Sequence, residues 1–138
     1  MALKRRIVVC LLLNDCVLFR TRGFVADYRY TQSFVTFDFA DELVILDVTR
    51  EPTAESRERF WVHVRGLTER AFLPVSIGGN IGTAEEVKRA IQECGAEGVV
   101  LGRSAWRPGF VEELVDKFGS QAVTVGLDHR GFGLVARD

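Results

Sequence analysis

Residues 75–90, VSIGGNIGTAEEVKRA, join a strand pattern to a helix pattern through the tripeptide Gly-Gly-Asn at 78–80. The helix pattern begins at Thr83, and Glu86 follows three residues later, which is the spacing of a capping box. A strand that ends in glycines just before a helix N-terminus is typical of parallel α/β sheets, where such turns approach ligands closely. The stretch therefore predicts both the fold class and a first candidate site.

The same order of strand and helix recurs along the chain. Short apolar runs, which predict strands, occur at Ile7–Leu13, Leu43–Leu46, Val75–Ile77, Val99–Leu101 and Val123–Leu127. Helical patterns lie over 54–67, over 83–94 and from Pro108 to Phe118. This order predicts an α/β fold with a parallel sheet and right-handed crossovers. Because the runs barely alternate, we expect the strands to be covered on both faces.

Two segments depart from this order. Residues 24–40 occupy the place of a first crossover helix, but they carry six aromatic residues without a helical period. Their pattern leaves a short helix and an irregular aromatic patch as alternatives. The tail GFGLVAR at 131–137 is typical of a strand or a small hairpin arm. We therefore expect a single domain over 1–138, with about five parallel strands plus a short extra C-terminal strand.

Composition narrows the function class. The 138 residues are 47% hydrophobic, with 18 basic and 19 acidic residues, so neither a nucleic-acid arm nor a basic membrane-binding face is expected. The apolar run that follows the basic residues at the start is short and lacks a small-residue cleavage site, so we interpret it as a buried strand of a cytoplasmic protein. Cys10, Cys16 and Cys94 lack metal-ligand spacing. They predict reduced thiols, no metal and no cofactor.

The predicted strand ends carry the candidate binding residues, because ligands of parallel α/β folds bind beyond the carboxyl ends of strands. Glycines let backbone N–H groups approach an anion, and an arginine with a serine can bind the same anion. The predicted phosphate site consists of Gly78, Gly79, Asn80, Gly102, Arg103 and Ser104. The alternative is that the two glycines only make a tight turn.

Two aspartates at strand ends are candidates for proton transfer. Asp47 and Asp128 each follow a predicted strand, where burial can tune a carboxyl group for acid–base chemistry. The alternative for Asp47 is the organisation of the turn that follows it. Asp128 is the stronger catalytic candidate, because it ends what we predict to be a long buried strand.

Five segments resemble, in order, the N-terminal half of the cyclase subunit of imidazole glycerol phosphate synthase, the HisF family. They read KRRIVVCLL, DELVILDVT, PVSIGGNI, GAEGVVLGRSA and FGSQAVTVGLD. The resemblance implies half of a (β/α)8 barrel made of two similar halves. It also implies a doubly phosphorylated substrate, with one phosphate bound by each half. Two catalytic aspartates and ammonia from a glutamine amidotransferase partner complete the family's chemistry.

The resemblance is uneven at the site. Asp128 falls on the family's catalytic aspartate after the fifth strand, and the turn at 78–80 falls on its phosphate-binding turn. Arg20 stands where the family has a lysine, so the resemblance implies a substrate-binding role for it, together with Asp47. Leu12 stands where the first catalytic aspartate is expected. Since leucine cannot transfer a proton, the chain is similar to divergent second copies, and we expect that cyclase activity is lost.

The length of the sequence carries a further expectation. A barrel of this kind takes about 250 residues, whereas the sequence ends just after the fifth predicted strand. The apolar inner wall, predicted to include Val9, Leu11, Val44, Leu46 and Val100, then needs cover. Segments 24–40 and 131–137 are one source of cover, and a second copy of the chain is the other. We expect self-association, as a dimer.

Three functions stay open from the sequence. The first is a self-associating module that binds a phosphorylated small molecule. The second is a lyase of the imidazole glycerol phosphate synthase type, which serves histidine biosynthesis and uses Asp128. The third is an interaction protein that docks a glutamine amidotransferase.

Overall fold

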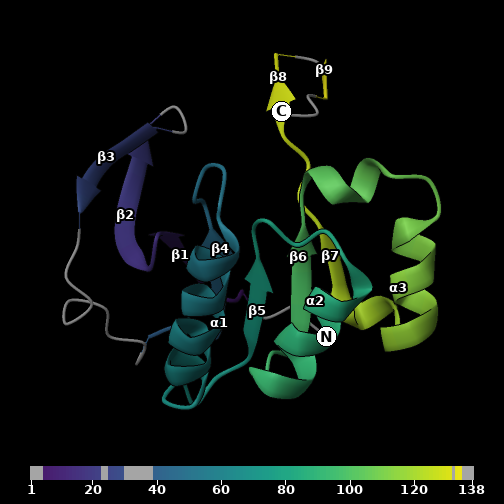
Figure 1. The fold of residues 1–138 in the computed structure, drawn as a ribbon, viewed down its shortest axis with the longest axis horizontal. Helices are drawn as coiled ribbons and strands as arrows, with labels where there is room; N and C mark the ends of the chain where they lie inside the picture. Colours follow the sequence, from purple (N-terminus) through teal and green to yellow (C-terminus); the bar gives the residue numbers. More distant parts are fainter. Residues whose placement is uncertain (1–4, 23–24, 30–38, 132, 135–138) are drawn as a thin grey trace.

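The computed structural model describes residues 5–22, 25–29, 39–131 and 133–134 (Figure 1). Within these residues, seven strands form one open sheet in the order β3-β2-β1-β4-β5-β6-β7. The strands are β1 (Val8–Asn14), β2 (Val17–Arg22), β3 (Val25–Arg29), β4 (Glu42–Asp47), β5 (Val75–Gly78), β6 (Gly98–Leu101) and β7 (Val123–Val125). A separate hairpin pairs β8 (His129–Arg130) with β9 (Gly133–Leu134).

The five strands that the sequence predicted form the parallel part of this sheet. β1 pairs with β4, β4 with β5, β5 with β6 and β6 with β7, each in parallel. This arrangement confirms the α/β fold class and matches one half of a TIM-type barrel. The β8–β9 hairpin confirms the strand-like tail, and in Figure 1 it projects beyond the carboxyl end of β7.

An antiparallel hairpin stands where a first crossover helix was expected. β2 pairs with β1 and β3 pairs with β2, so the hairpin extends the sheet at the β1 edge. Asp15 and Cys16 form the turn between β1 and β2, and their positive φ angles of 47° and 64° are typical of a two-residue turn between antiparallel strands. Residues 25–29 of the aromatic segment are therefore strand, and residues 30–38 lie outside the described part of the chain.

The helices begin and end close to the predicted residues. α1 (Ala54–Thr68) and α3 (Phe110–Phe118) are regular, whereas α2 (Ala84–Lys88) continues into a π-helix, η2 (Arg89–Glu93). Thr83 caps α2 as predicted, because its Oγ1 accepts a hydrogen bond from the amide of Glu86 at 3.2 Å. Two short 3₁₀ turns, η3 (Arg103–Trp106) and η4 (Ser120–Ala122), flank α3. No helix in the described ranges is long and apolar enough to span a membrane.

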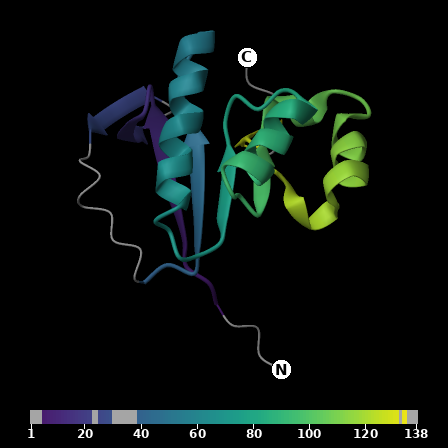
Figure 2. The ribbon, with the colours of Figure 1, turned by 60° about the horizontal axis from the view of Figure 1, so that its bottom comes forward.

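The helices cover one face of the sheet. In Figures 1 and 2, α1 and α2 lie against the central strands and α3 lies beside β7. Alternate strand residues point into this layer and are buried there with the apolar stripes of the helices. The largest fully buried side chains are Phe60, Leu13, Leu43, Ile45, Ile77, Leu101, Leu114, Val64, Val87 and Val99. This layer is the hydrophobic core of the domain.

The opposite face of the sheet has no covering layer among the described residues. Leu12, Val44, Leu46 and Val100 point to it, and each stays partly exposed. Val44, Leu46 and Val100 were predicted there, but the prediction was wrong for Leu11, which is only 7% exposed within the core. The prediction was also wrong for Val9. Because alternate residues of a strand face the same side, Val9 faces the core with Leu11. The strands alternate little because both faces are apolar, although the described residues cover only one of them.

Candidate functional site

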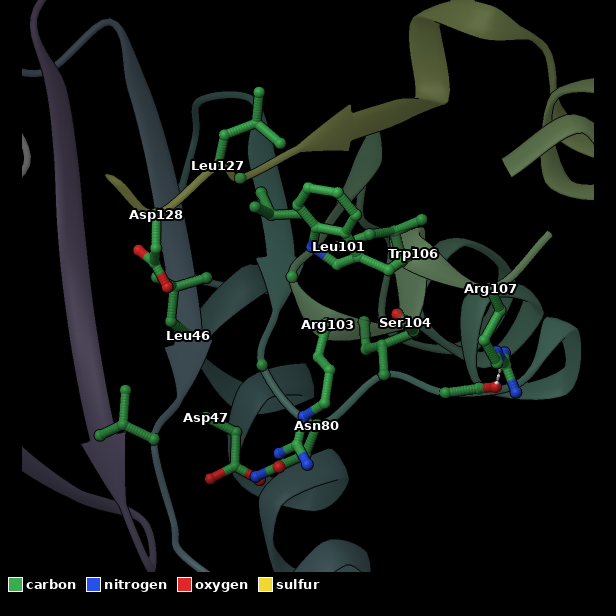
Figure 3. A pocket seen from close by; sticks show the side chains of 17 residues that line it. Leu46, Asp47, Asn80, Leu101, Arg103, Ser104, Trp106, Arg107, Leu127 and Asp128 are labelled. Carbon is green, nitrogen blue, oxygen red and sulfur yellow. Dashed lines mark hydrogen bonds between the residues drawn. The ribbon is translucent and has the colours of Figure 1, made fainter. Parts of the chain in front are cut away.

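A pocket of about 730 Å³ lies beyond the carboxyl ends of β4, β5, β6 and β7 (Figure 3). Each of these strands supplies part of its wall through the residues that follow it. The pocket brings together seven of the residues predicted from strand ends: Asp47, Gly79, Asn80, Gly102, Arg103, Ser104 and Asp128. Gly78 lies one residue before the wall, at the end of β5.

The two glycines after β5 are required by the packing of the protein itself. A Cβ atom on Gly79, whose φ is +81°, would lie 2.1 Å from the carbonyl oxygen of Asp47 and 2.5 Å from its amide nitrogen. A Cβ atom on Gly78 would lie 2.6 Å from the carbonyl oxygen of Val100. No side chain fits at either position. The tight-turn alternative therefore explains both glycines without a ligand.

Asn80 continues this turn in the left-handed region, with a φ of +53°. Asparagine tolerates that conformation better than most residues. Its Nδ2 donates a hydrogen bond to the carbonyl oxygen of Thr49 at 2.9 Å, which connects the turn after β5 to the turn after β4. The side chain therefore has a structural partner, and the backbone of the turn forms the pocket wall.

Asp47 organises the turn after β4. It is buried, with Oδ1 accepting a hydrogen bond from the amide of Thr49 at 3.0 Å and Oδ2 paired with Nη1 of Arg57 at 2.6 Å. Because both oxygens already have partners, the geometry agrees with the turn-organising alternative for this residue. Its role in substrate binding stays a prediction.

Arg57, on the first turn of α1, is a residue that the sequence reasoning missed. Its Nη2 pairs with Oε1 of Glu86 at 3.1 Å, and its guanidinium lies 5.0 Å from the ring centre of Phe60 and 4.9 Å from that of Trp61. Arg57 precedes the buried stripe of α1 by one helical turn. A cation one turn before an apolar stripe could have marked Arg57 in the sequence, because a buried charge needs a buried partner.

The turn after β6 carries polar groups that the protein leaves without partners. The side chain of Arg103 is exposed and, in Figure 3, extends toward Asn80 and Asp47. The Oγ of Ser104 is buried, yet it has no hydrogen-bond partner among the residues that the structure describes. A buried hydroxyl without a partner costs about 1–3 kcal/mol, and a bound acceptor would relieve that cost. This end of the pocket therefore has unused hydrogen-bonding capacity.

The far wall adds apolar and cationic groups that were not predicted. Trp106 and Leu127 are 49% and 55% exposed, although both are large apolar residues. Arg107 donates a hydrogen bond to the carbonyl oxygen of Gly82 and lies 4.0 Å from the ring centre of Phe110. The pocket thus combines a polar floor and two arginines with one apolar side.

The family model for "histidine biosynthesis protein" matches residues 12–138. The chain belongs to this family. The matched range includes every residue that lines the pocket.

Several curated proteins named "Imidazole glycerol phosphate synthase subunit HisF" are similar to the chain. The protein from Streptococcus sanguinis is 36% identical over 135 residues, which are 91% of this chain and 51% of that relative. The protein from Acidobacterium capsulatum is 40% identical over 92 residues, which are 66% of this chain and 35% of the relative. The protein from Streptococcus gordonii is 34% identical over 137 residues. The chain spans about half the length of these relatives at most.

The structure places Asp128 in the pocket but Leu12 outside the pocket lining. Asp128 lines the pocket and is exposed, because β7 ends at Val125 rather than at Leu127 as predicted. It therefore does not end a long buried strand, although it faces the same cavity as Arg103. Leu12 lies in β1, opposite Leu46, on the uncovered face of the sheet. A leucine there offers no proton donor or acceptor.

Two other predictions concern positions outside the pocket. Arg20 lies in β2, opposite Tyr28 of β3, and its side chain lies outside the described part of the structure. Cys94 is a buried free thiol whose pKa is raised mainly by burial, and Cys10 and Cys16 are also free. Within the described ranges no group of three His, Cys, Asp or Glu side chains is placed to hold a metal ion.

Proposed function

We propose that this HisF-like protein binds a phosphorylated small molecule at the carboxyl ends of β4–β7, self-associates through its uncovered sheet face, and lacks cyclase activity. One observation carries the binding proposal: Arg103 and the unpartnered Ser104 lie in the same pocket wall as the turn at 79–80. A phosphate group would accept hydrogen bonds from both side chains and from backbone N–H groups of the turn.

Calorimetric titration with inorganic phosphate, and then with a sugar phosphate, tests the binding proposal. We expect binding of both anions, and we expect Arg103→Ala to weaken it about tenfold, the size of one lost charge-assisted hydrogen bond. Arg65→Ala is the matched control, because Arg65 is an exposed arginine of α1 that pairs with Glu69 at 3.2 Å. A wild-type chain that binds no anion at millimolar phosphate would refute the proposal.

The uncovered face of the sheet supports self-association. Leu12, Val44, Leu46 and Val100 leave apolar area on it, and covering such area stabilises an assembly by about 25 cal/mol per Å². A second copy of the same face is the partner we propose. Light scattering after size exclusion should give twice the 15.5 kDa of one chain. Val44→Lys should return the protein to monomer, whereas Val62→Lys on the exposed side of α1 should not; a wild-type monomer at micromolar concentration would contradict the proposal.

A second function rests on Asp128. Because its carboxylate shares the pocket with Arg103, an alternative is a cyclase or lyase of the imidazole glycerol phosphate synthase type. A glutamine amidotransferase partner would belong to that alternative. Turnover of the family's substrate with ammonia, abolished by Asp128→Asn, would favour it over the binding module. Loss of cyclase activity is proposed from Leu12, which leaves the first aspartate position without a proton-transfer group.

A further inference from the structure

Arg57 occupies a central place behind the pocket wall. Its side chain is 13% exposed, and its two terminal nitrogens pair with carboxylates from two different segments: Asp47 at the end of β4 and Glu86 in α2. The faces of Phe60 and Trp61 lie beside the same guanidinium. A single arginine therefore connects α1, β4 and the segment that follows β5.

Both carboxylates continue into the turn that walls the pocket. The second oxygen of Glu86, Oε2, accepts a hydrogen bond from the amide of Gly82 at 2.8 Å. The backbone of Asp47 contacts Gly79 so closely that no Cβ atom fits between them. Arg57 is thus linked to Gly79 through Asp47 and to Gly82 through Glu86.

A third connection runs through Thr49. Asp47 accepts a hydrogen bond from the amide of Thr49, and Thr49 in turn accepts one from the side chain of Asn80. The side chain of Asn80 is therefore linked through Thr49 to Asp47, whose carboxylate pairs with Arg57. The cation also compensates a buried carboxylate that would otherwise face an incoming anion.

From these contacts we propose that Arg57 is a positioning residue for anion binding: it fixes the turn at 79–82 and neutralises Asp47 without touching the ligand. The inference rests on the proposed phosphate site and adds to it the residue that shapes the site from behind. A lysine at 57 keeps one positive charge but cannot bridge two carboxylates in the same way, because its ammonium is a point charge rather than a planar fork.

Arg57→Lys is the test, and Arg89→Lys is its matched control. Arg89 also lies near Trp61, at 5.5 Å from its ring centre, but it pairs with Glu58 at 2.6 Å and with Glu93 at 3.2 Å rather than with Asp47 and Glu86. We expect Arg57→Lys to weaken inorganic phosphate binding about tenfold, because one carboxylate loses its charge-assisted bond and the turn at 79–82 is held less firmly, and to speed hydrogen exchange in 79–82. We expect Arg89→Lys to change neither.

The two measurements separate the inference from the proposed function. If wild type and Arg57→Lys bind phosphate equally and exchange equally in 79–82, the positioning role is refuted while the phosphate site stands. If the wild type binds no phosphate, the proposed function fails. Equal hydrogen exchange of wild type and Arg57→Lys in 79–82 would then refute the positioning role as well. A purely stabilising role would lower the free energy of unfolding without changing the phosphate affinity of the folded protein. Should Arg57→Lys not fold, Glu86→Gln removes one charge of the same bridge and is read in the same way.

Discussion

The turn after β5 and the turn after β6 both bring a glycine to the pocket, but the protein uses them differently. In the first turn, Gly79 packs against the backbone of Asp47 and Asn80 donates a hydrogen bond to Thr49. In the second, a Cβ atom on Gly102 would meet nothing within 4 Å, and the hydroxyl of Ser104 has no partner.

This difference distinguishes residues that the packing of the protein requires from residues that a ligand could bind. The first turn is determined by contacts within the chain, so its glycines would be required even without a ligand. The second turn contains a buried hydroxyl for which the described residues supply no hydrogen-bond partner. A glycine at a strand end is therefore weak evidence of a site by itself, whereas an unpartnered buried hydroxyl beside an exposed arginine is stronger evidence.

Alanine substitution of the two glycines should give the largest contrast. Gly79→Ala should lower the free energy of unfolding by about 3 kcal/mol or more, because it adds a backbone clash to a left-handed φ. Gly102→Ala should change it by less than about 1 kcal/mol, since the added methyl group meets open space. Urea denaturation measures both values. Equal losses would remove the distinction between the two turns.

Two substitutions of Asn80 distinguish the loss of its side-chain hydrogen bond from the cost of its left-handed backbone. Asn80→Ala should cost about 1–2 kcal/mol, because it removes the bond to Thr49 and leaves an alanine at φ +53°. Asn80→Gly loses the same bond but relieves the conformational cost, so its effect should be smaller than that of alanine. Urea denaturation of the two variants checks this order, and the reverse order would mean that the left-handed conformation at residue 80 adds no cost to alanine.

Ser104 should give the smallest change in stability, with an unusual sign. Ser104→Ala should leave the unliganded protein unchanged or more stable by up to about 1 kcal/mol, because it removes a buried hydroxyl without a partner. The same variant should bind phosphate more weakly, which calorimetry can measure. Ser56→Ala is the control, since the hydroxyl of Ser56 donates to the carbonyl oxygen of Thr53 at 3.0 Å. A clear loss of stability in Ser104→Ala would show that the hydroxyl has a partner within the protein.

The sequence predicted much of the pocket because topology alone brings the carboxyl ends of parallel strands together. Gly79, Arg103 and Asp128 are far apart in sequence, and they line one cavity for that reason. Arg57 was missed because its importance depends on two carboxylates that fold onto it from other segments. The prediction that Asp128 ends a long buried strand was wrong, because β7 is only three residues long and its end is exposed.

The antiparallel pairing of β1 with β2 shows the limit of local patterns. Aspartate favours turns, but Cys16 is an unusual residue at a positive φ, so the turn at 15–16 gave little warning. The run Ile7–Leu13 was apolar throughout and could not reveal which face of β1 is buried. Leu11 faces the core only because β1 pairs with β4 in a register that places it beside Ile45.

By itself, the sequence determined the five parallel strands, the helices between them and their order, because apolar periodicity and helix caps are local properties of the chain. Tertiary structure alone decided which face of the sheet the helices cover, why Gly78 and Gly79 admit no side chain, and which polar groups near the pocket stay without partners. Those features depend on contacts between residues that are distant in sequence, and their geometry is fixed only when the segments pack together.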